Sequence, residues 1–244
     1  MFSNGMYYFD IHCHILNGID DGARNPEVTA QMLKMAYDDG IRGIICTPHY
    51  QPGTFDTGKA ERVIRVKHLR EIAQKFFPDL RIYEGCECFA ASGSIVDDID
   101  RGLSGTLADS RYFLAEFSPY TPGKIIERRL MDILAAGYWP IVAHAERYFA
   151  FEEEAFRSHI ASFCYIQMNA DSIMGEDGPK IRKLARKMLS EKIVSFVATD
   201  AHGAHHRIPK LSECADYISS NFGEEYAETV LCRNPESIIQ NVKI

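Results

Sequence analysis

The sequence lacks the features that mark membrane-spanning, exported and nucleic-acid-binding proteins. None of its apolar runs approaches the ~20 residues that cross a bilayer, and no basic segment followed by an apolar stretch begins the chain. The 244 residues carry a formal net charge of −7, and a surface of that sign repels nucleic acid and anionic lipid. We therefore expect a cytoplasmic protein without a nucleic-acid partner or membrane insertion. The sequence gives no indication of oligomeric state.

Several kinds of reactive site are also absent. The seven cysteines show no C-x-x-C spacing, which excludes the usual sulfur zinc site and favours a reducing compartment. No cysteine is followed six positions later by arginine, so the thiolate loop of cysteine phosphatases is missing. The G-x-x-x-x-G-K-[ST] and G-x-S-x-G motifs are missing as well. If this protein cleaves phosphate esters, metal-activated water must be the nucleophile.

The apolar pattern predicts an alternation of strands and helices. Seven short segments rich in β-branched and aromatic residues predict strands buried on both faces: 6–9, 41–46, 80–85, 112–117, 139–143, 163–168 and 193–198. Capping residues and helical spacing predict helices over 26–39, 59–77, 121–137, 152–161, 179–190, 210–220 and 223–231, with a short one from 234. This alternation predicts an α/β fold, either a βα barrel or a wound sheet, with residues 1–244 as one domain.

A polar or ionisable residue follows each predicted strand. Parallel strands share one carboxyl-end face, where active sites form, so these side chains should converge. Imidazoles and carboxylates are ligands for zinc, manganese or iron. Bound metal ions would also explain why the stretch FDIHCHILNGIDDGA crowds so many acids and histidines together.

The order of the motifs resembles a known family. DIHCH, TPH, GCE, EF, VAH and TDAH resemble the polymerase-and-histidinol-phosphatase (PHP) domain. FDIHCHILNGIDDGA, TPHY, DSRYFLAEF, PIVAHAERY and ATDAHG more closely resemble the bacterial capsule-locus tyrosine phosphatases of the CpsB/CapC type, nearly end to end. The resemblance implies a distorted seven-stranded (β/α) barrel of the PHP type. It also implies two to three divalent metal ions per chain, with manganese expected and iron or zinc as alternatives.

The resemblance further implies a set of metal ligands. A first ion would be held by His12, His14, Glu87 and Asp200. A second would be held by Glu116 and His144, with Glu87 bridging, and a third by Asp21, His49 and His202. Arg147 and Arg207 match the phosphate-binding arginines of the family, although each could instead pair with a neighbouring carboxylate.

Four further residues near these motifs have interpretations of their own. Asp10 is interpreted as orienting a ligand histidine from outside the ligand set. Asp20 is interpreted as facing solvent or capping the loop. His205 and His206 are candidates for a supporting role, including that of proton donor.

The resemblance, together with the candidate ligands and arginines, implies a metal-dependent protein-tyrosine phosphatase in which metal-bound hydroxide attacks phosphotyrosine. The resemblance implies that its partner is a bacterial tyrosine autokinase of capsule or exopolysaccharide synthesis. The first alternative is a histidinol-phosphate phosphatase of the same fold, which differs in loops around the site. A second alternative is a non-catalytic structural PHP module, although such modules often lose ligands and this chain keeps all nine. Amidohydrolases use a similar barrel, but the two arginines favour an anionic substrate.

Overall fold

The computed structural model describes residues 5, 7–91 and 95–244. All strand pairings between the named strands are parallel, as the buried apolar runs predict. The strands are β1 (Tyr8–Cys13), β2 (Ile41–Cys46), β3 (His49–Tyr50), β4 (Arg81–Glu84), β5 (Glu87–Phe89), β6 (Tyr112–Glu116), β7 (Trp139–Val142), β8 (Tyr165–Asn169) and β9 (Phe196–Ala198). One sheet has the order β1-β2-β4, and the other has the order β3-β5-β6-β7-β8-β9.

The prediction of an α/β fold is confirmed, but the strands are divided differently from the prediction. The described residues form nine strands in two sheets, and the longer sheet is curled. The chain leaves β2 at Cys46 and forms β3 from His49, and it leaves β4 at Glu84 and forms β5 from Glu87. Neither β3 nor β5 was predicted. The predicted strand 6–9 begins at Met6, which lies outside the described residues, and β1 runs past its predicted end to Cys13.

The predicted helices are all present, with small shifts at their ends. They are α1 (Pro26–Asp38), α2 (Lys59–Phe76), α4 (Gly123–Ala135), α5 (Glu154–Ala161), α7 (Pro179–Ser190), α8 (Ser212–Phe222), α9 (Glu224–Glu228) and α10 (Asn234–Ile239). Two short helices, α3 (Asp97–Asp100) and α6 (Ala170–Met174), were not predicted. The π-helical turn η3 (Thr229–Arg233) joins α9 to α10. No helix among the described residues is long and apolar enough to cross a membrane.

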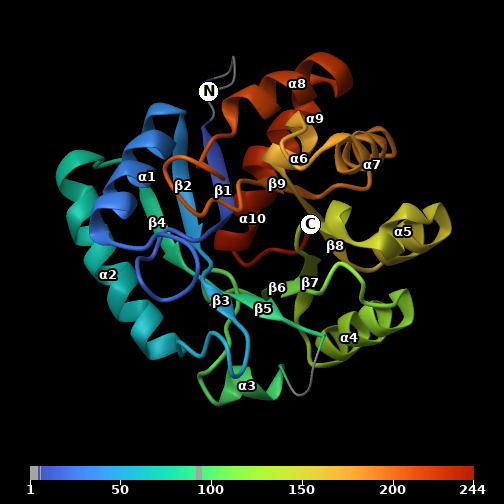
Figure 1. Ribbon diagram of the computed structural model, residues 1–244, viewed down its shortest axis with the longest axis horizontal. Helices are drawn as coiled ribbons and strands as arrows, with labels where there is room; N and C mark the ends of the chain where they lie inside the picture. Colours follow the sequence, from blue (N-terminus) through green and yellow to red (C-terminus); the bar gives the residue numbers. More distant parts are fainter. Residues whose placement is uncertain (1–4, 6, 92–94) are drawn as a thin grey trace.

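The strands lie inside a ring of helices, and β1 lies beside β9 (Figure 1). A parallel bridge between Cys13 and Ala201 joins the two sheets there. Alternate strand residues point to the inside of the curled sheet, where they form a separate apolar cluster. The cluster comprises Phe9, Ile11, Ile45, Leu107, Tyr112, Leu114, Ile141, Ala143, Phe196, Ala198 and Ile238. Because the last of these belongs to α10, that helix packs against the inner face.

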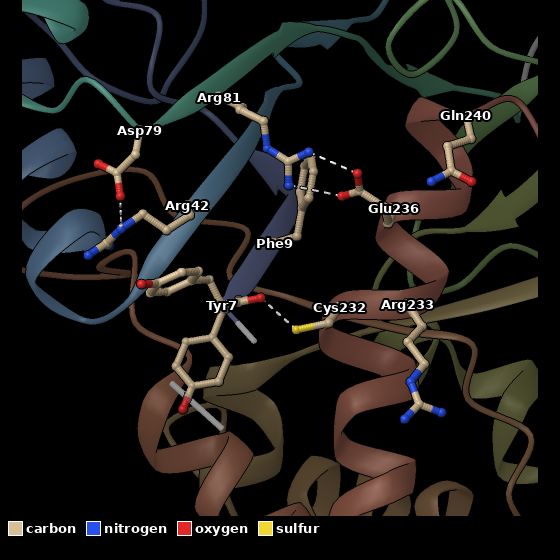
Figure 2. A pocket seen from close by; sticks show the side chains of 10 residues that line it. Tyr7, Phe9, Arg42, Asp79, Arg81, Cys232, Arg233, Glu236 and Gln240 are labelled. Carbon is tan, nitrogen blue, oxygen red and sulfur yellow. Dashed lines mark hydrogen bonds and ion pairs between the residues drawn. The ribbon is translucent and has the colours of Figure 1, made fainter. Parts of the chain in front are cut away.

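The amino ends of the strands are closed by paired charges (Figure 2). Arg81 at the start of β4 makes two hydrogen bonds, of 2.8 and 2.9 Å, to the carboxylate of Glu236 on α10. Arg42 in β2 donates to Asp79 over 2.9 Å. A cavity of about 440 Å³ lies among these residues. Each of these two arginines has a carboxylate partner, so the chain itself neutralises their positive charges at this end of the sheet.

Candidate metal centre

The predicted site residues meet at the opposite, carboxyl ends of the strands. On β6 the inward face carries Tyr112 and Leu114 in the apolar cluster, and the two-residue repeat puts Glu116 next on that face. On β9 the same repeat leads from Phe196 and Ala198 to Asp200, just beyond the strand. The apolar inner face therefore ends in a layer of carboxylates and imidazoles.

One candidate ligand group consists of four side chains, namely His12, His14, Glu87 and Asp200. The Nε2 atoms of the two histidines are 3.1 Å apart. Glu87 Oε2 lies 3.0 and 3.1 Å from them, and Asp200 Oδ1 lies 3.4 Å from each. All four residues are buried. The structure thus brings together the four residues predicted to hold the first ion.

The hydrogen bonds of the two imidazoles fix which ring nitrogen carries a proton. His12 Nδ1 is 3.1 Å from Gln167 Oε1, which also accepts the backbone N–H of His144 and is therefore an acceptor. His14 Nδ1 is 2.7 Å from Asp20 Oδ2. Both Nδ1 atoms must donate, so in the neutral rings both Nε2 lone pairs face the same point.

This arrangement fits a bound cation. Two lone pairs and two carboxylate oxygens aimed at one point repel each other unless a positive charge lies between them. Burial raises the pKa of Glu87, whereas positive charge on His12 and His49, which a bound divalent ion would replace, holds that pKa well below its usual range. Glu87 Oε2 and Asp200 Oδ1 are buried without a hydrogen-bond partner. A divalent ion would satisfy all of these atoms together.

A second group contains the residues predicted to hold the third ion, Asp21, His49 and His202, together with His14. Asp21 Oδ1 lies 3.5 Å from His49 Nε2 and 3.4 Å from His202 Nε2. His202 Nδ1 donates to the backbone oxygen of Asp200 over 2.8 Å, which leaves Nε2 free to bind metal. Burial is the largest cause lowering the pKa of His202, and this favours the neutral form that a ligand requires.

The third group consists of His49, Glu87 and Glu116, whereas the sequence had placed His144 with these two acids. His49 Nδ1 lies 3.0 Å from Glu87 Oε2 and 3.4 Å from Glu116 Oε2. His144 Nε2 is 2.9 Å from Glu87 Oε1 and 3.8 Å from Glu116 Oε1. Both histidines therefore reach the pair of acids, and Glu87 belongs to two of the three groups. Burial lowers the pKa of His49, but Glu87 and Glu116 outweigh it and raise that pKa to about 9.

Both predicted arginines contact Asp200 Oδ2, the carboxylate oxygen that does not face His12 and His14. Arg147 donates to Asp200 Oδ2 over 3.0 Å, and Arg207 lies 2.5 Å from the same oxygen. Arg147 also pairs with Asp177 at 3.0 Å, rather than with the adjacent Glu146. Asp200 therefore joins the metal-ligand group on one side to two guanidinium groups on the other.

Asp10 and Asp20 match the roles expected from the sequence only in part. Asp10 accepts the backbone N–H groups of Thr199 and His12 over 3.0 and 3.3 Å, so it fixes backbone and does not touch a ligand imidazole. Asp20 does cap its loop, by accepting the N–H of Gly22, but the side chain is buried, so the expectation that it faces solvent was wrong. Its hydrogen bond orients His14 instead.

The backbone is strained at three of these residues. Within the described chain, seven non-glycine residues have positive φ, and they include His144 at 32°, Asp200 at 52° and Arg207 at 48°. Such conformations are unfavourable for residues with a Cβ atom and tend to occur at functional sites. The local structure holds these three side chains against their conformational preference.

One orienting residue, Gln167, was missed from the sequence. Gln167 is a polar side chain within the apolar strand β8, and its amide serves both His12 and His144. A polar residue in an otherwise apolar, buried strand is the signal that could have identified it.

His205 and His206 lie with Arg207 around a neighbouring cavity of about 380 Å³, outside the ligand groups.

A parallel α/β fold with imidazoles and carboxylates gathered at the carboxyl ends of its strands is typical of metal-binding enzymes. The family can be stated more closely. The CpsB/CapC family of capsular polysaccharide synthesis matches residues 8–240, and this chain belongs to it.

Named relatives extend over nearly the whole chain. Tyrosine-protein phosphatase CpsB of Streptococcus pneumoniae is 34% identical over 239 residues, covering 95% of this chain and 98% of that protein. Tyrosine-protein phosphatase YwqE of Bacillus subtilis is 28% identical over 237 residues, covering 96% and 92%. A crystal structure from work on YwqE of Bacillus subtilis and CpsB of Streptococcus pneumoniae, described as "unique metal-dependent tyrosine phosphatases", matches this chain with a TM-score of 0.89 at 28% identity. The match covers 97% of this chain and 96% of the crystallised chain.

Proposed function

We propose that this protein is a metal-dependent protein-tyrosine phosphatase, a hydrolase of phosphoric monoesters. The observation that carries the proposal is the position of Asp200. One of its oxygens faces His12 and His14, and the other holds Arg147 and Arg207. A metal-ligand group and a phosphate-binding pair thus share one carboxylate. Full-length relatives named as tyrosine-protein phosphatases support the same activity.

We further propose that two to three divalent ions bind, with manganese expected and iron or zinc as alternatives. His12, His14, Glu87 and Asp200 would hold one ion. Asp21, His49 and His202 would hold another, and Glu116 and His144 would complete a site bridged by Glu87. When bound, such ions lower the pKa of a coordinated water toward ~7 and polarise the phosphoryl oxygens. The buried atoms without hydrogen-bond partners support this assignment.

Arg147 and Arg207 are proposed to hold the equatorial oxygens of the phosphate. Each guanidinium has five N–H donors in a planar fork. Arg207 Nε is buried without a partner, so donors remain for an incoming anion while Asp200 holds the group in place. Charge-assisted hydrogen bonds of this kind strengthen as charge develops on the transferring phosphoryl group.

The substrate is proposed to be phosphotyrosine in a protein, with a bacterial tyrosine autokinase of capsule or exopolysaccharide synthesis as the partner, and this protein itself is proposed to be cytoplasmic. A phenol with a pKa of ~10 leaves with less acid assistance than an alkanol. The seven cysteines are free and buried, which fits a reducing compartment. Histidinol phosphate would need an acidic pocket for its ammonium group, but the nearby carboxylate of Glu146 is buried and accepts the N–H of Asn169.

The finer description of the fold is also a proposal. If β2 and β3 are one interrupted strand, and β4 and β5 another, the chain has the seven strands of a distorted PHP-type barrel. The bridge between Cys13 and Ala201, which links the strands at the ends of the order, supports closure. Residues 1–244 would then act as a single catalytic domain.

A competition assay tests the proposed function. The protein is loaded with manganese and given a tyrosine-phosphorylated peptide and histidinol phosphate at equal concentrations, with the serine-phosphorylated form of the same peptide as a matched control. We expect the phosphotyrosine peptide to have the highest kcat/KM. Preference for histidinol phosphate would overturn the proposal while leaving the metal site intact, and no hydrolysis of any of the three would favour a structural module.

A further inference from the structure

Helix α7 is strongly basic although the protein as a whole is acidic. Its twelve residues include three lysines and two arginines and no acid, whereas the chain has a net charge of −7. Lys180, Lys183 and Lys187 are spaced by three and four residues, so they lie along one face of the helix. All three are exposed. A concentrated positive face on an acidic protein is suited to attracting an anionic partner.

This face forms one wall of a groove of about 760 Å³, which we call the α7 groove. Two aromatic residues, Tyr120 and Phe149, also line the groove, and their rings are 5.0 Å apart. Their exposed fractions, 78% and 48%, are high for large aromatic residues. Ile181 and Leu184 add apolar surface to the lining. The α7 groove therefore offers apolar contact and positive charge together, as a peptide-binding surface requires.

The acids within the α7 groove are already neutralised. Glu152 forms an ion pair with Lys180 at 2.6 Å, and Asp177 pairs with Arg147 at 3.0 Å. The third acid, Glu146, is buried. Lys187 is neutralised as well, by an ion pair with Glu154 at 2.9 Å. By contrast, Lys183 forms no ion pair with any described residue. The residues that line the groove therefore carry a net positive charge, which the groove presents to solvent at Lys183.

Arg147 connects the α7 groove to the candidate metal centre. It lines the groove, and its NH1 lies 3.0 Å from Asp200 Oδ2. A phosphate held by Arg147 would therefore place the adjoining residues of its chain along α7. We propose that the α7 groove binds the peptide segment next to the phosphotyrosine and selects acidic side chains there. This inference rests on the proposed function and goes beyond it by naming the substrate sequence that the enzyme prefers.

The test compares two phosphotyrosine peptides that differ only in having Glu or Gln at the positions beside the phosphotyrosine. We expect the wild-type protein to favour the Glu peptide by ~10-fold in kcat/KM at low salt, the scale of one or two well-placed ion pairs. The preference should shrink as salt is added. Lys183→Glu should abolish it, whereas Lys183→Arg should keep it.

Two controls separate the groove from the metal centre. Arg182→Glu reverses the same charge on the same helix, at an exposed residue that does not line the groove, and should keep the preference. Free phosphotyrosine has no neighbouring residues to contact Lys183, so its hydrolysis should be equal in all variants. Equal rates on the two peptides with the wild-type protein would overturn the inference and leave the phosphatase assignment standing. Failure to hydrolyse both peptides and free phosphotyrosine would overturn the proposed function and, with it, this inference.

Discussion

The two ends of the parallel sheets handle charge in opposite ways. At the amino ends, Arg42 and Arg81 each meet a carboxylate, and Arg81 binds Glu236 in a two-point geometry (Figure 2). At the carboxyl ends, Glu87 and Asp200 meet imidazoles whose lone pairs point at them. The strands are the same, so the backbone does not explain the difference. At the amino ends the charges are paired within the chain, whereas the ligand groups at the carboxyl ends require the positive charge of a bound metal ion.

The largest effect is expected when Glu87, at the carboxyl ends of the strands, loses its negative charge. Glu87→Gln keeps the size of the side chain but removes a charge that two of the three ligand groups share. Metal content should fall, and activity should drop by ~10³-fold or more, equivalent to several kcal/mol of transition-state stabilisation. Metal analysis and phosphatase assays measure both effects. The matched variant Glu236→Gln at the amino end should change neither, and equal losses in the two variants would remove the distinction between the ends.

A smaller but still large effect is expected from the arginines behind Asp200. Arg147→Ala or Arg207→Ala should lower kcat/KM by ~10²-fold, the scale of one charged donor lost from the transition state. Metal content should stay constant, because neither side chain belongs to a ligand group. Arg81→Ala is the control at the other end. An unchanged rate would reduce that arginine to a salt-bridge partner of Asp200.

The loss of an orienting residue should weaken metal binding without removing it. Asp20→Asn can still lie beside His14 Nδ1 but no longer fixes the proton there as a carboxylate does. Metal affinity should fall by ~10–100-fold, as for other residues that orient a ligand histidine. Titration of metal into the stripped protein measures this, with Asp38→Asn on the exposed surface of α1 as the control. Equal affinities for Asp20→Asn and the wild-type protein would show that His14 needs no orientation.

The smallest effect is expected at the amino ends. Arg81 and Glu236 are 47% and 36% exposed, so solvent screens their ion pair. Arg81→Ala should lower the free energy of unfolding by ~1 kcal/mol or less and leave activity unchanged. Thermal unfolding of the metal-loaded protein measures the change. A loss of activity would mean that this end supports the site after all.

The positions of the site residues followed from the sequence because strand ends are easy to recognise. Apolar runs mark the strands, and the next polar residue must then lie at the shared carboxyl edge, as Glu116 and Asp200 do. The groups of residues could not be assigned from spacing alone. Whether His49 or His144 completes a ligand group depends on the short strand β3, which Thr47 and Pro48 separate from β2.

The orienting residues were harder to predict for a different reason. Asp20 and Asp21 are adjacent and chemically alike, yet the first is buried against His14 and the second is 57% exposed. Only the path of the loop distinguishes them. The lining of the α7 groove likewise includes Phe149 and Lys180, which are far apart in the sequence and come into contact only through the packing of α7. Such relations depend on tertiary packing and leave no local pattern in the sequence.

The central claim is that the carboxyl end of the sheet is completed by divalent metal ions. The most direct test is to measure the metal content and the aryl phosphatase activity of the same sample before chelation, after chelation and after addition of manganese. The account predicts two to three ions per chain, loss of activity with the metal, and recovery of activity as the ions return. A metal-free protein that still hydrolyses aryl phosphates at the original rate would contradict it.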